Sequence, residues 1–176
     1  MGADPLKTDS SPWVARFAPL VKAGGCVLDV ACGGGRHSRL FLDLGHPVVA
    51  MDKDISQAAM AQGAERIAAD LEDGSPWPLM GRRFACVVVT NYLWRPLFPL
   101  LVDSLETDGV LIYETFALGN EAFGRPRNPD HLLGRGELLR LTAELNVVAY
   151  EDGIVGGHKV VQRLCAVNGP GPVALP

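Results

Sequence analysis

The stretch VLDVACGGGR at residues 27–36 constrains the fold more than any other part of the chain. An apolar run at 26–31 leads into three consecutive glycines, and a segment with helical spacing of its apolar residues follows at about 36–44. This order predicts a strand, a tight turn and a helix. In open α/β sheets, such a turn gives a ligand close access to the backbone beside the start of the helix. A glycine pattern alone does not identify the ligand, since a nucleotide, a nucleoside or no ligand at all is compatible with it.

The alternation of strands and helices continues along the chain. Further strands are predicted at 47–51, 67–69, 84–90, 110–116, 147–151 and 159–167. Helices are predicted from Ser11 to the glycines at 24 and 25, and at 56–62, 97–106 and 137–144. The strands before residue 117 are continuous apolar runs, which is typical of parallel strands covered on both faces. The last two strands are joined by too few residues for a parallel crossover, so they must pair antiparallel.

The sequence therefore predicts an α/β fold with a doubly wound, mostly parallel, seven-stranded Rossmann-like sheet and a C-terminal antiparallel strand pair. Two connections are unusual. The segment EDGSPWPLMGRR at 72–83 contains Pro76 and Pro78, which predicts a loop where such folds usually have a helix. The segment 117–136 is long and irregular, and long loops in compact domains are usually functional or mobile.

Composition excludes several classes of protein. The chain has 176 residues, of which 48% are hydrophobic and 20% charged, and this size predicts a single domain over 1–176 with flexible tails at 1–10 and 169–176. A net charge of −4 argues against a broad nucleic-acid-binding face. The cysteines are widely spaced, which predicts neither a metal site nor a disulfide framework. No apolar run reaches the roughly 18 residues that a membrane span needs, and a cytoplasmic location is expected.

Two acids near the glycines favour one kind of ligand. Asp52 ends the second strand, 17 residues beyond Gly35, where its carboxylate could accept hydrogen bonds from both hydroxyls of a ribose or could simply cap a helix. Asp29 lies inside the first strand, where a carboxylate would repel a pyrophosphate but would suit a ligand with an ammonium group and a positive charge. S-adenosylmethionine is such a ligand.

At this point the sequence resembles a known family. LDVACGGGR resembles the first motif of the class I S-adenosylmethionine-dependent methyltransferases, with Ala31 where the family usually has glycine. VVAMD resembles the second motif, AADLEDGSPWPL the third, and FACVVVTNYLWRPL the fourth, with Ala85 where the family often has an acid. NYLWRP and FGRPRNPDHLL are similar to stretches of a small bacterial subgroup, the tellurite-resistance-like methyltransferases. The resemblance covers about 27–168.

The resemblance implies a cofactor site for S-adenosylmethionine. The methionine part would contact Asp29 and the backbone of Ala31, Gly33 and Gly35. The ribose would contact Asp52, with Lys53 beside it, and the adenine would contact Asp70 and Leu71. Asn91 and Tyr92 would line the pocket near the sulfonium, although a strand-end turn and a core aromatic explain these two residues equally well.

The acceptor side is less well defined. The candidate substrate residues are Trp94, Arg95, Arg125, Arg127 and His131, and the last three lie on a loop that could recognise an anionic group, act as a lid or be a solvated surface loop. Methyl transfer by in-line displacement requires no particular acid or base. His37, Tyr92, Glu114 and His131 could act as a base, but none has a diagnostic spacing. His37 suits a packing or capping role better, and Glu114 could pair with Arg95.

The sequence thus predicts an S-adenosylmethionine-dependent methyltransferase. We expect a small-molecule acceptor because the chain has no insertion of the kind that larger relatives use to enclose one, although a partner chain or an exposed group of a larger molecule would also fit. An alternative is a non-catalytic S-adenosylmethionine-binding or regulatory module, suggested by Ala31, Ala85 and the small size. A nicotinamide-dependent reductase is disfavoured by Asp29 and by the antiparallel strand pair. The oligomeric state stays open.

Overall fold

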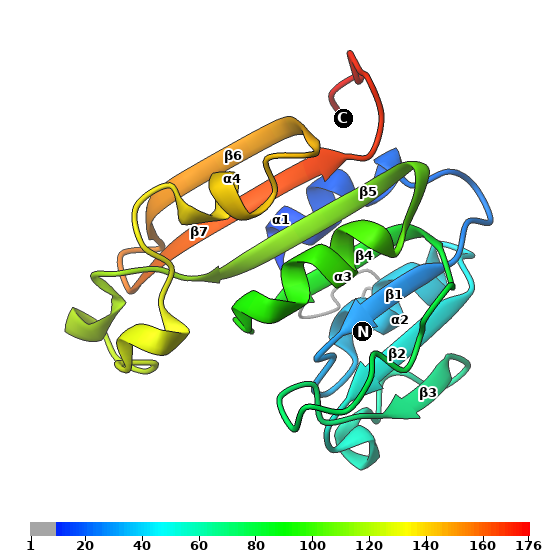
Figure 1. The fold of residues 1–176 in the computed structure, drawn as a ribbon, viewed down its shortest axis with the longest axis horizontal. Coiled ribbons are helices and arrows are strands. Elements are labelled where there is room, and N and C mark those ends of the chain that lie inside the picture. The colour runs from blue at the N-terminus through cyan, green and yellow to red at the C-terminus, as the bar shows by residue number, and fades with distance from the viewer. Residues whose placement is uncertain (1–9) are drawn as a thin grey trace, which may run out of the picture.

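A seven-stranded sheet forms the centre of the molecule, with strand order β3-β2-β1-β4-β5-β7-β6 (Figure 1). The structure, a computed structural model, describes residues 10–176. The strands are β1 (Val27–Val30), β2 (Val48–Asp52), β3 (Glu65–Ala68), β4 (Phe84–Thr90), β5 (Leu105–Phe116), β6 (Asn146–Val155) and β7 (Lys159–Val167). The first five pair in parallel, and β7 pairs antiparallel with both β5 and β6. The predicted sheet, including its C-terminal antiparallel pair, is confirmed.

Helices cover both faces of the sheet (Figure 1). The α-helices are α1 (Pro12–Phe17), α2 (Arg36–Asp43), α3 (Phe98–Asp103) and α4 (Glu137–Leu141). On one face, Trp13 and Phe17 of α1 and Phe41 of α2 pack into a core with apolar residues of β1, β2, β4, β5 and β7. On the other face, α3, α4 and the 72–83 loop pack against the opposite side chains of these strands. No helix in the described residues is long and apolar enough to cross a membrane.

Local chemistry explains where α1 begins and ends. The Ser11 hydroxyl accepts a hydrogen bond from Trp13 N–H at 3.2 Å, and Pro12 occupies the first helical position, where no N–H is needed. After Phe17 the chain tightens into the 3₁₀ turn η1 (Ala18–Leu20), which contains Pro19. The predicted first helix is therefore confirmed at its start, but its helical structure ends at Leu20 rather than at the glycines at 24 and 25, and its last turn is changed by the second proline.

One predicted helix is wrong. Residues 56–62 form only the 3₁₀ turn η2 (Ile55–Gln57) followed by turns. The reason is packing under the glycine turn: Met60 N–H donates to the Gly34 carbonyl at 3.0 Å, and Ala58 and Ala61 are fully buried. These contacts hold the segment in an irregular path although its alanines favour a helix, so tertiary packing overrides propensity.

Other boundaries shift by a few residues. β5 begins at Leu105 rather than 110, which ends α3 at Asp103, and β6 continues to Val155. β3 lies at 65–68 rather than 67–69, and α4 ends at Leu141 rather than 144. The tail predicted at 1–10 lies outside the described residues except for Ser10, and 169–176 form no regular element.

The two unusual connections, at 72–83 and 117–136, are irregular, as predicted. Residues 69–83 contain only turns and irregular backbone, and Trp77 and Leu79 from this loop are buried against the sheet in place of a helix. Residues 117–136 contain only the short 3₁₀ turns η4 (Asn120–Ala122) and η5 (Pro129–His131). The two ends of that loop are joined, because Leu133 N–H donates to the Phe116 carbonyl and Leu118 N–H to the Leu133 carbonyl, both at 3.0 Å.

Candidate functional site

The strand order places a crevice at the carboxyl edge of the sheet, where β1 lies between β2 and β4. A cavity of about 180 Å³ opens there. It is lined by Ala31, Asp52, Lys53, Ala69, Asp70, Leu71, Glu72 and Tyr92. The structure therefore brings six of the ten predicted cofactor residues to one cavity. Asp29, Gly33, Gly35 and Asn91 lie outside its lining.

The glycine turn is held in a left-handed backbone conformation. Ala31, Gly33 and Gly35 have φ values of 51°, 51° and 81°. A Cβ on Gly35 would lie 2.8 Å from the backbone nitrogen of Ala61, so only glycine fits there. A Cβ on Gly33 or Gly34 would meet nothing within 4 Å, which leaves the backbone open to a ligand on that side.

Asp52 is fixed at the end of β2 by two backbone donors. Gly33 N–H donates to Asp52 Oδ2 at 2.8 Å, and Asp54 N–H donates to Asp52 Oδ1 at 2.9 Å. The first of these bonds connects the carboxylate to the glycine turn. Each carboxylate oxygen can accept more than one hydrogen bond, so Asp52 keeps acceptor capacity toward the cavity that it lines.

Asp29 is buried, with 1% of its surface exposed. Its Oδ2 accepts hydrogen bonds from Ser38 N–H at 2.9 Å and from the Ser38 hydroxyl at 2.6 Å, which ties the first turn of α2 to β1. Burial raises the pKa of Asp29 to about 6, against the lowering effect of the bonds from Ser38. This structural contact was not foreseen from the sequence, and a contact of Asp29 with a ligand stays a prediction.

One ion pair and two hydrogen bonds lie on the side of the cavity that was predicted to hold the adenine. Lys53 Nζ lies 2.6 Å from Asp70 Oδ2, and this bond lowers the pKa of the Asp70 carboxyl. Asp70 Oδ1 accepts from Glu72 N–H at 3.0 Å. The Tyr92 hydroxyl donates to Glu72 Oε1 at 3.0 Å. Glu72 is thus a cavity residue that sequence reasoning missed, although it lies inside the stretch AADLEDGSPWPL that pointed to Asp70.

The end of β4 is strained. Asn91 has a φ of 54°, and its N–H donates to the Glu114 carbonyl at 2.9 Å. Asparagine tolerates this conformation better than most residues, and strained strand ends are common at functional sites. Burial and the bond to Glu72 raise the pKa of the Tyr92 phenol well above its usual value, so this group stays protonated at neutral pH.

His37 is engaged inside the protein. It is buried, its Nε2 accepts from Ser11 N–H at 3.1 Å, and its Nδ1 lies 3.4 Å from the Thr90 hydroxyl. Burial lowers the pKa of His37 to about 3, so the ring is neutral at neutral pH. The packing role expected for His37 agrees with these contacts.

Glu114 pairs with other residues than predicted. Its carboxylate accepts from the Ser11 hydroxyl at 3.1 Å and lies 3.3 Å from Arg163 and 3.8 Å from Lys159. Arg163 lies directly opposite Glu114 in the antiparallel register of β5 and β7, which explains the pairing. The suggested pair with Arg95 is therefore wrong.

Arg95 instead holds the 117–136 loop. Its guanidinium forms a two-point ion pair with Glu137, at 2.6 and 3.0 Å, and donates to the carbonyls of Asp130 and Leu132. Trp94 is half-buried against the core. Both residues have structural roles, and neither lines the cavity.

Arg125, Arg127 and His131 are exposed on the same loop, which projects beyond the carboxyl end of β5 (Figure 1). Within residues 10–176, the side chains of Arg125 and Arg127 make no ion pair or hydrogen bond. The structure does not bring these three side chains into the cavity.

The sheet order, the glycine turn after β1 and the acid that ends β2 define the fold of the class I S-adenosylmethionine-dependent methyltransferases. TehB from Haemophilus influenzae has this fold and matches with a TM-score of 0.73 at 14% identity, over 92% of this chain and 63% of TehB. The chain thus spans less than two thirds of the length of TehB.

Two further solved structures match at similar levels. A TehB-like S-adenosylmethionine-dependent methyltransferase from Corynebacterium glutamicum gives a TM-score of 0.65 at 18% identity, over 88% of this chain and 85% of that one. The N-methyltransferase NodS from Bradyrhizobium japonicum, in complex with S-adenosylhomocysteine, gives 0.64 at 17% identity, over 95% and 93%. The sequence matches no protein-family model and no curated protein. At these identities the matches establish the fold.

The left-handed backbone at Ala31 gives a first prediction. Ala31→Gly should leave the free energy of unfolding unchanged or raise it by up to about 1 kcal/mol, because glycine adopts this conformation without the Cβ clash. Ala50→Gly, a buried position in the ordinary strand backbone of β2, should lower it by about 1 kcal/mol. Urea unfolding followed by circular dichroism measures both variants. Equal destabilisation by the two substitutions would contradict the assigned backbone at Ala31.

The buried Asp29 gives a second prediction. Its folded pKa of about 6 lies above the ordinary value of 3.8, so the folded state holds the proton more tightly and loses stability as pH rises through this window. Between about pH 4 and pH 6, wild type should lose up to about 3 kcal/mol relative to Asp29→Asn, which keeps an acceptor for Ser38. Urea unfolding of both proteins across this range gives the difference between their free energies of unfolding. His37 changes the stability in the opposite direction with pH, but both proteins contain it, so its effect cancels in this difference. A difference that does not vary with pH would refute the assignment.

Proposed function

We propose that the chain is a cytoplasmic S-adenosylmethionine-dependent methyltransferase that acts on a small-molecule acceptor. The observation that carries this proposal is the Asp52 carboxylate, which is fixed by Gly33 N–H beside a turn whose backbone is open to a ligand. The class I fold and a neighbour of this fold in complex with S-adenosylhomocysteine support the choice of cofactor.

The residues present fit this cofactor. The backbone of Ala31, Gly33 and Gly35, which is open to a ligand at Gly33, would hold the methionine part near the charge of Asp29, and Asp52 would accept hydrogen bonds from the ribose hydroxyls. Asp70 and Leu71 would contact the adenine. To bind the adenine, Asp70 would either accept from it while still paired with Lys53 or release Lys53. Asn91 and Tyr92, at the end of β4, would lie toward the reacting methyl group.

S-adenosylmethionine supplies an activated methyl group, which a nucleophile takes in one in-line displacement that leaves S-adenosylhomocysteine. The protein then needs mainly to align the acceptor, and orientation of this kind can lower a barrier by several kcal/mol, about 7 to 11 in the best cases. His37 is neutral with both ring nitrogens engaged, Glu114 is paired with cations, and Tyr92 stays protonated. Because these three side chains are not free to accept a proton, we favour an acceptor atom whose electron pair is available without a base from the protein.

The acceptor side is proposed to be the 117–136 loop. Arg125, Arg127 and His131 follow the carboxyl end of β5, the edge at which ligands of such sheets bind, and the two arginines have no partner within residues 10–176. Guanidinium groups bind carboxylates and phosphates in a two-point geometry, which supports a small acceptor with an anionic group. The net charge of −4 argues against nucleic acid.

The alternative is a non-catalytic module that binds the same cofactor. Internal engagement of His37 and Glu114 is the observation that favours it. Both candidates require cofactor binding, and only the first requires methyl transfer. Transfer of a labelled methyl group from S-adenosylmethionine to any component of a metabolite extract would exclude the non-catalytic module.

Cofactor binding is tested by calorimetry with S-adenosylhomocysteine. Wild type should bind, and Asp52→Asn should bind at least about tenfold more weakly, because hydrogen bonds to a charged acceptor contribute about 1.5 to 3 kcal/mol. Asparagine still accepts from Gly33 N–H, so the turn stays in place. Asp43→Asn, at the end of α2, removes the same charge away from the cavity and should bind as wild type does. Unchanged binding by Asp52→Asn would overturn the proposed site.

The role of the loop is tested by the double variant with Arg125→Ala and Arg127→Ala. It should bind S-adenosylhomocysteine as wild type does but should transfer methyl groups at least about fivefold more slowly at limiting acceptor, since each lost charged contact contributes about 1 kcal/mol or more. Arg135→Ala, at an exposed arginine near the end of the same loop and outside the proposed set of acceptor residues, is the matched control. Equal rates for the double variant and wild type would show that these arginines do not recognise the acceptor.

A further inference from the structure

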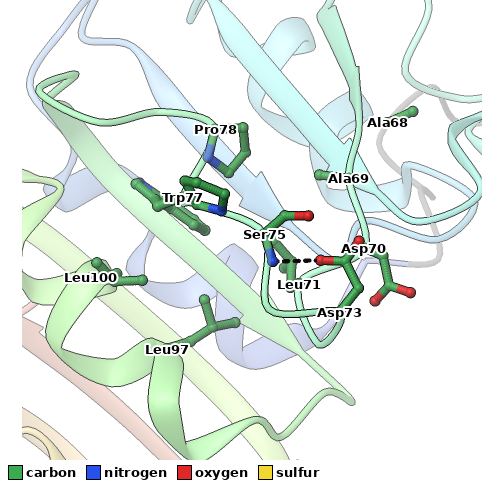
Figure 2. Close-up of a pocket in the computed structure, with 11 residues that line it drawn as sticks. Ala68, Ala69, Asp70, Leu71, Asp73, Ser75, Trp77, Pro78, Leu97 and Leu100 are labelled. Atoms are coloured by element: carbon green, nitrogen blue, oxygen red, sulfur yellow. Dashed lines mark hydrogen bonds between the residues drawn. The ribbon is translucent and has the colours of Figure 1, made fainter.

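A second cavity, of about 300 Å³, is lined in part by the 69–71 segment (Figure 2). Ala69, Asp70 and Leu71 line both this cavity and the candidate cofactor cavity, so the two cavities are neighbours. The other lining residues come from the 72–83 loop and from the segment that leads into α3. Neither the proposed cofactor site nor the proposed acceptor loop uses this space.

The 72–83 loop accounts for the cavity. Pro76 and Pro78 prevent a helix here, and the loop covers the sheet with Trp77 and Leu79 alone. The gap between Trp77 and the side chains of Leu97 and Leu100 stays open. A volume of this size falls at the lower end of the range of small-molecule pockets.

The two ends of the cavity differ in chemistry. Figure 2 shows Trp77, Leu97 and Leu100 toward one end, and Ser75, Asp73 and Asp70 toward the other. Trp77 and Leu97 are buried, so the apolar end of the cavity is largely enclosed by protein. No lysine or arginine lines the cavity within the described residues, and Lys53, the ionic partner of Asp70, lines the cofactor cavity instead.

We propose that this second cavity binds a small aromatic amine as its ammonium ion. An aromatic ring would pack against Trp77, Leu97 and Leu100, and the ammonium group would lie near Asp73 and Asp70. The two carboxylates would repel an anion of the same shape, and a fully polar ligand would gain little from the apolar end. This site does not depend on the proposed methyltransferase activity.

Calorimetric titration tests the proposal with three probes that share an indole ring. Tryptamine carries an ammonium group, tryptophol is neutral and indole-3-acetate is an anion. Tryptamine should bind most tightly, and its advantage over tryptophol should be about threefold at low salt and smaller at high salt, since exposed ion pairs are weak and screened. No binding of tryptamine at millimolar concentration, or equal binding of tryptamine and indole-3-acetate, would overturn the proposal.

Two variants locate the binding. Leu100→Trp fills the apolar end and should abolish tryptamine binding while S-adenosylhomocysteine binding is retained, because Leu100 does not line the cofactor cavity. Asp73→Asn keeps the acceptor for Ser75 N–H but removes one of the two charges, so it should reduce the threefold preference for tryptamine over tryptophol. Asp103→Asn, at the other end of α3, is the matched control and should keep that preference.

The outcomes separate this proposal from the proposed function. If tryptamine still binds to a correctly folded Leu100→Trp variant, the second cavity is not its site and the proposal fails. If wild type binds S-adenosylhomocysteine but not tryptamine, only the second site is refuted. If it binds tryptamine in the expected order but not S-adenosylhomocysteine, the second site stands and the proposed cofactor site is refuted.

Discussion

The left-handed turn after β1 is the constraint on which the carboxyl edge of the sheet depends. Gly35 approaches Ala61 so closely that no side chain fits between them, and this contact fixes both the start of α2 and the irregular segment after β2. The same turn directs Gly33 N–H at Asp52, so β1, β2 and α2 are joined by one short stretch of backbone. A ligand at this edge meets preformed groups, which lowers the ordering that binding requires.

Asp29 shows how a strand can contain an acid. Desolvation opposes its ionisation, and two donors from Ser38 offset part of that effect while they hold the helix against the strand. A buried carboxylate beneath the turn also creates a local negative potential in a region of low dielectric. That potential disfavours the phosphates that many glycine turns bind and favours a ligand with a positive charge, which is the physical basis for preferring a sulfonium cofactor over a dinucleotide.

The secondary-structure elements that follow from the spacing of apolar residues were predictable from the sequence. Apolar runs located the strands, and because parallel strands end at one edge, Asp52 and Asp70 could be expected near each other from the sequence alone. Contacts that depend on register or on close packing were not predictable. The pairing of Glu114 with Arg163 follows from the antiparallel alignment of β5 and β7, and the loss of the 56–62 helix follows from packing of Ala58 and Ala61 under the turn. Ser11, which joins His37 to Glu114, is distant in sequence from both.

The two halves of the proposed site differ in how they are built. Asp52 and Asp70 are held by backbone N–H groups of Gly33, Asp54 and Glu72, so their positions follow from the fold. The arginines proposed for the acceptor lie on a loop whose ends are fixed by Arg95 and by backbone bonds, while their own side chains are exposed. Substitutions in the loop can therefore change the acceptor with little effect on the sheet or on the cofactor acids. If the proposed function holds, a fold arranged in this way constrains the methyl donor far more than the molecule that receives the methyl group.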